Sequence, residues 1–305
     1  MNNFKANSND AMSPLIVFAT VMLMIMFGAS AVAAKYILTG FGEYTAAGMR
    51  FLLASVVIFL WARIAGKKLK INFQQLIEMT FFALILFAQI GLFNHGLKHT
   101  PASRAILIIN LQPFFVLLLA HVFIKGDSLN VKKVIGVILG FSGLVFVLSD
   151  GNIAGLLDGV KITDLYILIN TFLWAIGAVF IKRVIHKYKS YQIVFYQNII
   201  TVPLFFIAAF LFDEPMAANI TVFHIVTVLY YAVISTAFGF IMMNKLLAKY
   251  KATTVHSFVF IMPISGIIIS WLLLKEHISN HLFVSLVLII TGILLVNHEA
   301  KRKTE

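Results

Sequence analysis

The sequence predicts an all-α polytopic membrane protein with ten transmembrane helices, arranged as a 5+5 inverted-topology repeat. Three observations lead to this class: the composition, ten apolar runs, and one motif that occurs twice. Of the 305 residues, 61% are hydrophobic and 12% are charged, and the mean hydropathy is +0.96. A soluble domain carries about 25% charged residues, and a water-soluble fold of this length cannot bury so much apolar surface. Most of the chain must therefore face lipid.

Ten apolar runs approach or reach the length of a membrane span. A hydrocarbon core of about 30 Å needs roughly 20 apolar residues in helical form, and charged residues mark the ends of each run. We expect the two shortest runs, 134–149 and 165–181, to extend past their flanking charges, because long Lys and Arg stems can reach the interface. The runs are 14–34, 44–62, 79–97, 105–124, 134–149, 165–181, 190–212, 223–244, 252–274 and 278–298.

Basic residues indicate how these runs cross the membrane. Of the 24 Lys and Arg, 18 lie in the tails and loops of one side, 5 lie on the other side, and Arg50 lies within a helix. Because cytoplasmic loops carry the excess of Lys and Arg, we expect both tails in the cytoplasm of a cell whose inner (plasma) membrane holds the protein. The net charge of +12 then faces anionic headgroups, and no nucleic-acid partner is expected. The predicted segments are a tail at 1–13, five-helix repeats at 14–149 and 165–298, and a tail at 299–305.

One motif recurs at an offset of 150 residues. NHGLKHTPASRAILIINLQP at 94–113 and NKLLAKYKATTVHSFVFIMP at 244–263 share an Asn at the start and a Pro at the end. Apolar matches between membrane helices arise easily by chance, whereas paired Asn and Pro do not, so we interpret the motif as a duplication. Since each half holds an odd number of helices, the two halves enter the membrane from opposite sides. Inverted repeats of this kind are typical of secondary transporters.

The same features resemble a known family. Ten helices, a five-plus-five repeat and the segment TPASRA before the fourth helix are similar to the drug/metabolite transporter superfamily, specifically its EamA-type permeases. The loops ARIAGKKLK and FIKGDSLN also resemble that family, although its acidic GE pair is Gly-Asp at 126–127 here, with Lys-Glu at 275–276 in the other half. The resemblance implies transport of amino acids, nucleotide-like metabolites or xenobiotics, often outward. It also implies a cavity between the halves, lined chiefly by helices 1, 3, 4, 6, 8 and 9.

Two prolines, Pro113 and Pro263, fall in the middle of the fourth and ninth runs. Proline removes a backbone N–H and clashes with the preceding turn, and the freed polar groups cannot be satisfied by lipid. We expect each proline to mark a hinge or cavity wall; a static packing kink is the alternative.

Polar and aromatic side chains within the runs are the candidates for substrate binding. Amides are costly in hydrocarbon unless they are paired, and Trp174 lies mid-helix rather than in an interfacial belt. The alternative for each amide is an interhelical hydrogen bond, and for each aromatic ring a place in the core. The candidates are Trp174, Asn110, Gln112, Gln89, Phe93, Asn170, Tyr230, His256, Phe260 and Arg50.

Arg50 is the one clearly intramembrane guanidinium of the sequence. Such a charge costs roughly 2.5–3.5 kcal/mol at a helix centre, so it should be paired or face water. It could anchor a substrate carboxylate, snorkel outward, or pair with Glu43. No Asp or Glu lies deep in any run, which argues for facilitated transport, exchange, or coupling through His256 or His121, since histidine titrates near neutral pH.

The sequence therefore predicts a permease or exporter that moves a small organic metabolite, with amino acids or related carboxylates favoured. Two pairs of His spaced i and i+4 (His95 with His99, His277 with His281) have no acidic ligands beside them and cysteine is absent, so no metal or cofactor is expected. An intramembrane enzyme of lipid metabolism, a drug or xenobiotic efflux carrier and a passive channel remain alternatives. The Gly-x3-Gly stretch at 136–140 allows close helix packing, within the chain or across a homodimer.

Overall fold

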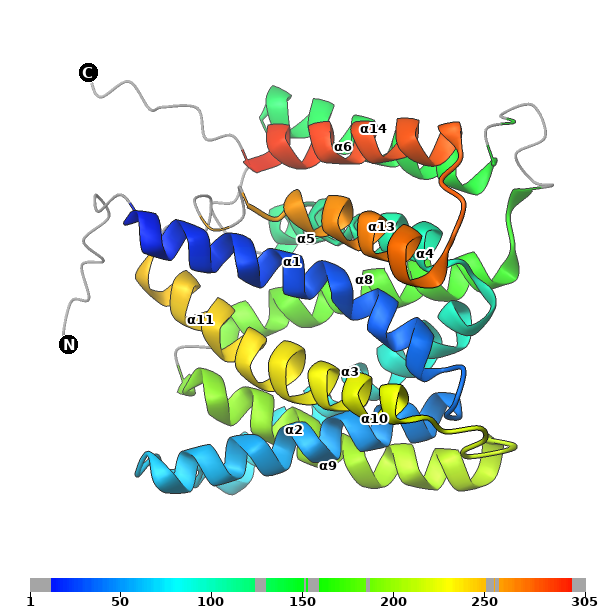
Figure 1. Ribbon diagram of the computed structural model, residues 1–305. Helices are drawn as coiled ribbons and strands as arrows, with labels where there is room; N and C mark the ends of the chain where they lie inside the picture. Colours follow the sequence, from blue (N-terminus) through cyan, green and yellow to red (C-terminus); the bar gives the residue numbers. More distant parts are fainter. Residues whose placement is uncertain are drawn as a thin grey trace, which may run out of the picture.

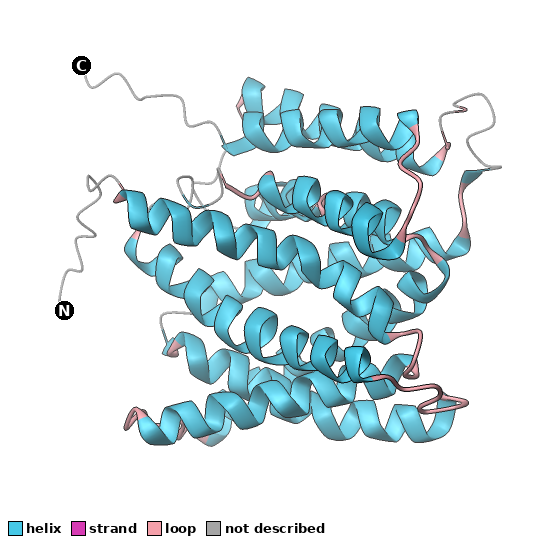
Figure 2. Ribbon diagram, in the orientation of Figure 1, coloured by secondary structure: helices cyan, strands magenta, loops and turns pink. Residues whose placement is uncertain are grey.

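In the computed structural model of the chain, every regular element of the described part is a helix (Figure 2), which confirms the all-α polytopic class. The structure describes residues 12–123, 130–150, 152, 159–184, 187–250, 255 and 258–297. The helices are α1 (Pro14–Ile37), α2 (Glu43–Ile64), α3 (Phe73–His99), α4 (Ala102–Ile109), α5 (Gln112–Phe123), α6 (Val131–Leu148), α8 (Ile162–Val184), α9 (Ser190–Phe212), α10 (Val222–Leu229), the π-helix η3 (Tyr230–Gly239), α11 (Phe240–Lys249), α13 (Ile261–Leu274) and α14 (Asn280–Asn297).

The helices account for the ten predicted runs. Within the described residues, eight helical stretches are long and apolar enough to cross a membrane, and α13 and α14 are shorter apolar helices. α4 with α5 forms one crossing, and α10, η3 and α11 form another. α6 begins at Val131 and α8 reaches Val184, so the two shortest runs do extend past their flanking charges.

The fourth and ninth runs each contain a turn just before the proline, so Pro113 and Pro263 do not lie mid-helix as expected, and their role as a hinge or cavity wall stays a prediction. α4 ends at Ile109 and α5 begins at Gln112, and a turn at 258–260 precedes α13. Pro113 and Pro263 then lie in the first turn of the following helix, where the missing N–H has no intrahelical partner to lose. The two breaks sit at equivalent positions of the two halves.

Helix pairing is nearly symmetric between the halves. α2 packs against α9 and α6 packs against α14, and these two pairs form opposite edges of the bundle in Figure 1. Between them, α1 with α13 corresponds to α8 with α4 and α5, and α3 with α8 corresponds to α1 with the α10–η3 stretch. Exchanging each helix for its counterpart five crossings later therefore reproduces the main helix pairs, although weaker pairs such as α1 with α4 have no equivalent among the described residues of the other half.

The Gly-x3-Gly stretch is used within the chain. A Cβ added at Gly136 would stand 2.7 Å from the Gly292 carbonyl oxygen, and one at Gly140 would overlap the Phe114 ring. Because small residues let two backbones approach closely, these glycines explain why α6 and α14 pack tightly at one edge of the bundle.

Candidate functional site: a buried arginine between α1, α2, α3 and η3

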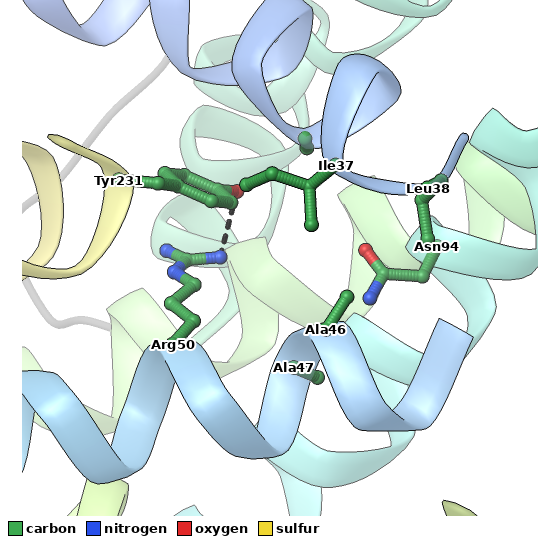
Figure 3. A pocket seen from close by; sticks show the side chains of 8 residues that line it. Ile37, Leu38, Ala46, Ala47, Arg50, Asn94 and Tyr231 are labelled. Carbon is green, nitrogen blue, oxygen red and sulfur yellow. Dashed lines mark hydrogen bonds between the residues drawn. The ribbon is translucent and has the colours of Figure 1, made fainter. Parts of the chain in front are cut away.

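Arg50 lies on the second turn of α2 and is buried, with 7% of its surface exposed. Its Nη1 donates to the Tyr231 hydroxyl at 2.6 Å, and its Nε donates to Thr236 Oγ1 at 2.8 Å. The guanidinium carbon also stands 3.7 Å from the centroid of the Tyr231 ring. Figure 3 shows the guanidinium beneath this ring, reaching from α2 toward η3. Both hydroxyls and the ring are neutral groups that offer only part of what a guanidinium gains from an anion.

No carboxylate approaches Arg50 within 4 Å across the described residues. Glu43, about two turns earlier on α2, instead pairs with His95 Nδ1 at 2.9 Å and with Lys98 Nζ at 3.3 Å. The two expectations that Arg50 snorkels outward or pairs with Glu43 are therefore wrong. Among the described residues, the buried Arg50 cation therefore has no counter-charge within 4 Å, which is costly unless another group supplies one.

The π-helix explains how two hydroxyls reach the same guanidinium. Tyr231 and Thr236 are five residues apart, and in an α-helix they would point about 140° apart. In a π-helix the hydrogen bonds run between residues five apart, so the two side chains align along one face. The Thr236 hydroxyl also donates to the Tyr231 carbonyl at 2.8 Å, which ties the side-chain pair to the local backbone. Hydrophobic periodicity carries no signal for this register, so Tyr231 and Thr236 could not be singled out from the sequence.

A small cavity adjoins the guanidinium. Its volume of about 10 Å³ is enough for roughly one water molecule. Asn94 closes one side, with its Nδ2 donating to the Glu43 carbonyl at 2.7 Å. Figure 3 shows Arg50 and Asn94 on opposite sides of the short Ala46 and Ala47 side chains. The lining residues are Ala34, Ile37, Leu38, Ala46, Ala47, Arg50, Asn94 and Tyr231. A solute larger than water needs this site to widen.

Charged residues tie helices together at one end of the bundle, which we call the α3–α4 end because it holds the C-terminus of α3 and the N-terminus of α4. Lys35 Nζ, from α1, donates to the carbonyls of Leu97, Lys98 and Thr100 at 2.7–3.0 Å. It therefore satisfies carbonyls at the end of α3 that lack helical partners. Lys35 thus acts as a capping residue that links α1 to the end of α3.

Glu276, after α13, caps the start of α4. Its carboxylate accepts hydrogen bonds from the backbone N–H groups of Ala102 and Ser103 and from the hydroxyls of Ser103 and Ser270, at 2.6–2.9 Å. Burial alone would raise the pKa of Glu276, but these hydrogen bonds outweigh it and hold that pKa below its ordinary value. The carboxylate at a helix N-terminus is also favoured by the helix dipole.

Arg104, in the first turn of α4, forms a second link at the same end. From the sequence, Arg104 is one of the basic residues expected in a loop outside the apolar runs. In the structure only 4% of its surface is exposed. Its Nε and Nη2 bind the two oxygens of Asp164 at 2.9 and 2.7 Å, and Nη1 binds Asp150. Asp164, at the start of α8, is fully buried. This two-pronged pair joins the first half to the second.

A known family of membrane proteins matches almost the whole chain. The model of the EamA-like transporter family matches residues 14–149 and 161–298. The chain belongs to this family. It is a multi-pass membrane protein of a transporter family, as the resemblance predicted.

Relatives of this EamA-like protein are transporters by name. It is 29% identical to the uncharacterized transporter YvbV of Bacillus subtilis, over 92% of this chain and 90% of the relative. It is 26% identical to a probable amino-acid metabolite efflux pump of Escherichia coli, over 90% of this chain and 91% of the pump. A solved crystal structure superposes with a TM-score of 0.68 at 15% identity, covering 93% of this chain and 96% of that one, which shows a shared fold.

Several predicted site residues make local hydrogen bonds in this EamA-like protein. The Asn110 amide donates to the Ile106 carbonyl at 2.7 Å, at the break between α4 and α5. With its amide oriented to satisfy both atoms, Asn170 donates to the Gln89 backbone carbonyl at 3.0 Å. The Tyr230 hydroxyl donates to the Met26 carbonyl at 2.7 Å. The Asn170 contact matches the alternative of an interhelical hydrogen bond, and the Tyr230 contact also joins two helices, whereas Asn110 bonds back to the end of its own helix α4.

The other candidates are dispersed. Phe93 belongs to the main hydrophobic core, and Phe260 precedes α13 and packs against that core. Trp174 and Gln112 are half-buried on α8 and α5. His256 lies outside the described residues. Of the nine predicted binding residues that the structure describes, only Arg50 lines the small cavity.

Proposed function

We propose that this EamA-like protein exports small organic metabolites that carry a carboxylate, with amino acids favoured, across a bacterial-type inner membrane. The proposal includes alternating access between two inverted halves, with both tails in the cytoplasm. The names of the amino-acid metabolite efflux pumps among its relatives support the substrate class. Chain-wide coverage of those relatives supports the transfer of the general activity.

The observation that carries the proposal is the buried Arg50, which has no counter-anion in the part of the chain that the structure describes. A carboxylate can accept two parallel hydrogen bonds from a guanidinium, a geometry that hydroxyl partners do not supply. Inside a low-dielectric site this attraction is stronger than in water. A substrate carboxylate would take the place that the Tyr231 hydroxyl now holds, and cationic solutes would be repelled.

Contacts at the α3–α4 end support alternating access. Arg104 with Asp164 and Ser103 with Glu276 each join the two halves there. The Thr100 hydroxyl also donates to the Thr163 hydroxyl at 3.0 Å. With the cavity at Arg50 as small as one water, this arrangement fits a state closed toward the α3–α4 end. That end faces the periplasm in the topology we propose, so export requires these contacts to part.

Transport by purified protein in liposomes tests the proposal. We expect wild-type protein to exchange labelled amino acids, and Arg50→Gln to lower the rate at subsaturating substrate by about 10-fold or more, since hydrogen bonds to charged groups contribute about 1.5–3 kcal/mol. Arg50→Lys keeps the positive charge but not the paired N–H donors of the guanidinium, so its transport rate should lie between those of wild type and Arg50→Gln. Arg63→Gln, on the exposed end of the same helix, is the matched control and should behave as wild type. Preference for cationic drugs over amino acids, or full activity of Arg50→Gln, would overturn the substrate assignment.

A further inference from the structure

We propose that a groove between α2 and the η3–α11 stretch holds one acyl chain of an anionic phospholipid, with the headgroup at Lys245. The groove has a volume of about 350 Å³, and all its lining residues except Lys245 are uncharged and apolar or aromatic. A volume of this size falls within the range of small-molecule sites, about 300–1,000 Å³. It is separate from the cavity at Arg50 and does not depend on the proposed substrate.

Depth in the membrane identifies the occupant as lipid. The groove runs along the η3–α11 stretch from Val233 to Lys245, which at the α-helical rise is about 18 Å. One leaflet is about half of the roughly 30 Å hydrocarbon core, so the groove spans approximately the depth of one leaflet. Ile234 and Phe238 on its wall are exposed on the protein surface, so the groove opens sideways to the bilayer.

Charge at one end of the groove selects the headgroup. Lys245 is exposed at that end of the groove. Arg63 at the end of α2, and Lys67 and Lys68 just after the turn at 65–66, are exposed. Figure 1 shows the C-terminal ends of α2 and α11 at the same end of the bundle. Basic pockets between transmembrane helices on the cytoplasmic side attract anionic lipid headgroups.

Trp61 marks the level of the headgroups. It lines the groove, and its ring packs edge-on against Tyr191 at 5.6 Å between centroids. Tryptophan prefers the membrane–water interface, so its position places Lys245 within reach of a phosphate while the apolar walls lie deeper. An apolar slot that leads to a basic rim matches one phospholipid better than a second protein helix, which would bring no negative charge to Lys245.

Native mass spectrometry of the detergent-purified protein tests this site. The protein is incubated with phosphatidylglycerol or with phosphatidylcholine of identical acyl chains, so that only the headgroup differs. We expect one phosphatidylglycerol to stay bound per chain, with about 5-fold preference over phosphatidylcholine. Both lipids carry the phosphate, but the choline ammonium cancels its charge and is repelled by Lys245. Lys245→Gln should abolish the preference, and Ile234→Trp, which fills the groove, should abolish retention of both lipids.

Lys132→Gln is the matched control, because Lys132 is an exposed lysine at the start of α6, away from the groove. It should retain phosphatidylglycerol as the wild type does. Equal retention of the two lipids by wild type, unchanged preference in Lys245→Gln, or a lipid-free dimer would each overturn the proposal. Lys245 is on the surface, so its variant remains informative if Ile234→Trp fails to fold.

Discussion

At the residue scale, isolated charges in the sequence have distinct roles that only their partners reveal. Arg50 is buried against two neutral hydroxyls, whereas Arg104 is buried against carboxylates. Lys35 and Glu276 cap the two helix ends that meet in the α3–α4 turn. The transport proposal depends on Arg50, and the proposed closure of the α3–α4 end depends on Arg104 and Glu276.

Replacing Glu276 by Gln should destabilise the protein by about 1–2 kcal/mol, as for loss of a helix N-cap. Because the pKa of Glu276 is held below its ordinary value of 4.5, its stabilisation is present above that value and is lost as pH falls through the lower, folded-state pKa. The thermal unfolding temperature of wild type, measured between pH 3 and 7, should therefore fall at acid pH. The fall should be smaller in Glu276→Gln. Glu214→Gln, in an exposed loop, is the control and should keep the wild-type profile.

Sequence reasoning identified Arg50 as a residue of interest because a lone arginine in an apolar run is conspicuous. It could not identify Tyr231 and Thr236, since their alignment depends on a π-helical register that leaves no trace in hydrophobic spacing. It also placed Arg104 in a loop, because a charged residue at the end of an apolar run is expected to face water. Its partner Asp164 is 60 residues away in the sequence, so the buried pair is visible only in the fold. Site residues that depend on a distant partner are the ones that the sequence alone misses.

At the element scale, hydropathy predicts the ten membrane crossings but not the interruptions within the fourth and ninth crossings. A proline inside an apolar run predicts a disturbance. The structure resolves it as a helix that ends and restarts, with Pro113 and Pro263 in the restarted first turn. The glycines at 136–140 predicted close packing, and only the fold shows that α14 is the partner.

Gly136→Ala should destabilise the protein by about 1–3 kcal/mol through overpacking, because its Cβ would meet the Gly292 carbonyl oxygen at 2.7 Å. Gly177→Ala is the control, since the nearest atom to its Cβ is 3.9 Å away, and it should be neutral or stabilising by up to about 1 kcal/mol from helix propensity. Unfolding in detergent followed by circular dichroism measures both. Equal losses in the two variants would contradict a tight α6–α14 interface.

At the scale of the whole molecule, the two halves have matching helix neighbours and meet through polar contacts at the α3–α4 end. The repeated motif predicted that equivalent helices would have equivalent neighbours, because equivalent residues of a duplication take equivalent places. It could not predict which end would be closed in the proposed cycle, since that depends on contacts such as Arg104 with Asp164. If access alternates, locking that end must stop transport.

A disulfide between Thr100→Cys and Thr163→Cys should provide this lock, since the two hydroxyl oxygens are 3.0 Å apart. The natural chain has no cysteine, so the pair can form no other bond within the molecule. We expect oxidation to abolish transport in the double variant, reduction to restore it, and either single variant to be indifferent to both. Transport that continues in the fully cross-linked protein would show that this end does not open.

The most direct test of the central claim compares an amino acid with its carboxamide, in which a neutral amide replaces the carboxylate. Binding of both compounds is measured to wild type and to Arg50→Gln. Isothermal titration should show wild type preferring the amino acid by about 10-fold or more, as charge-assisted hydrogen bonds require, and Arg50→Gln binding the two alike. If the discrimination is the same in both proteins, Arg50 does not hold the substrate carboxylate.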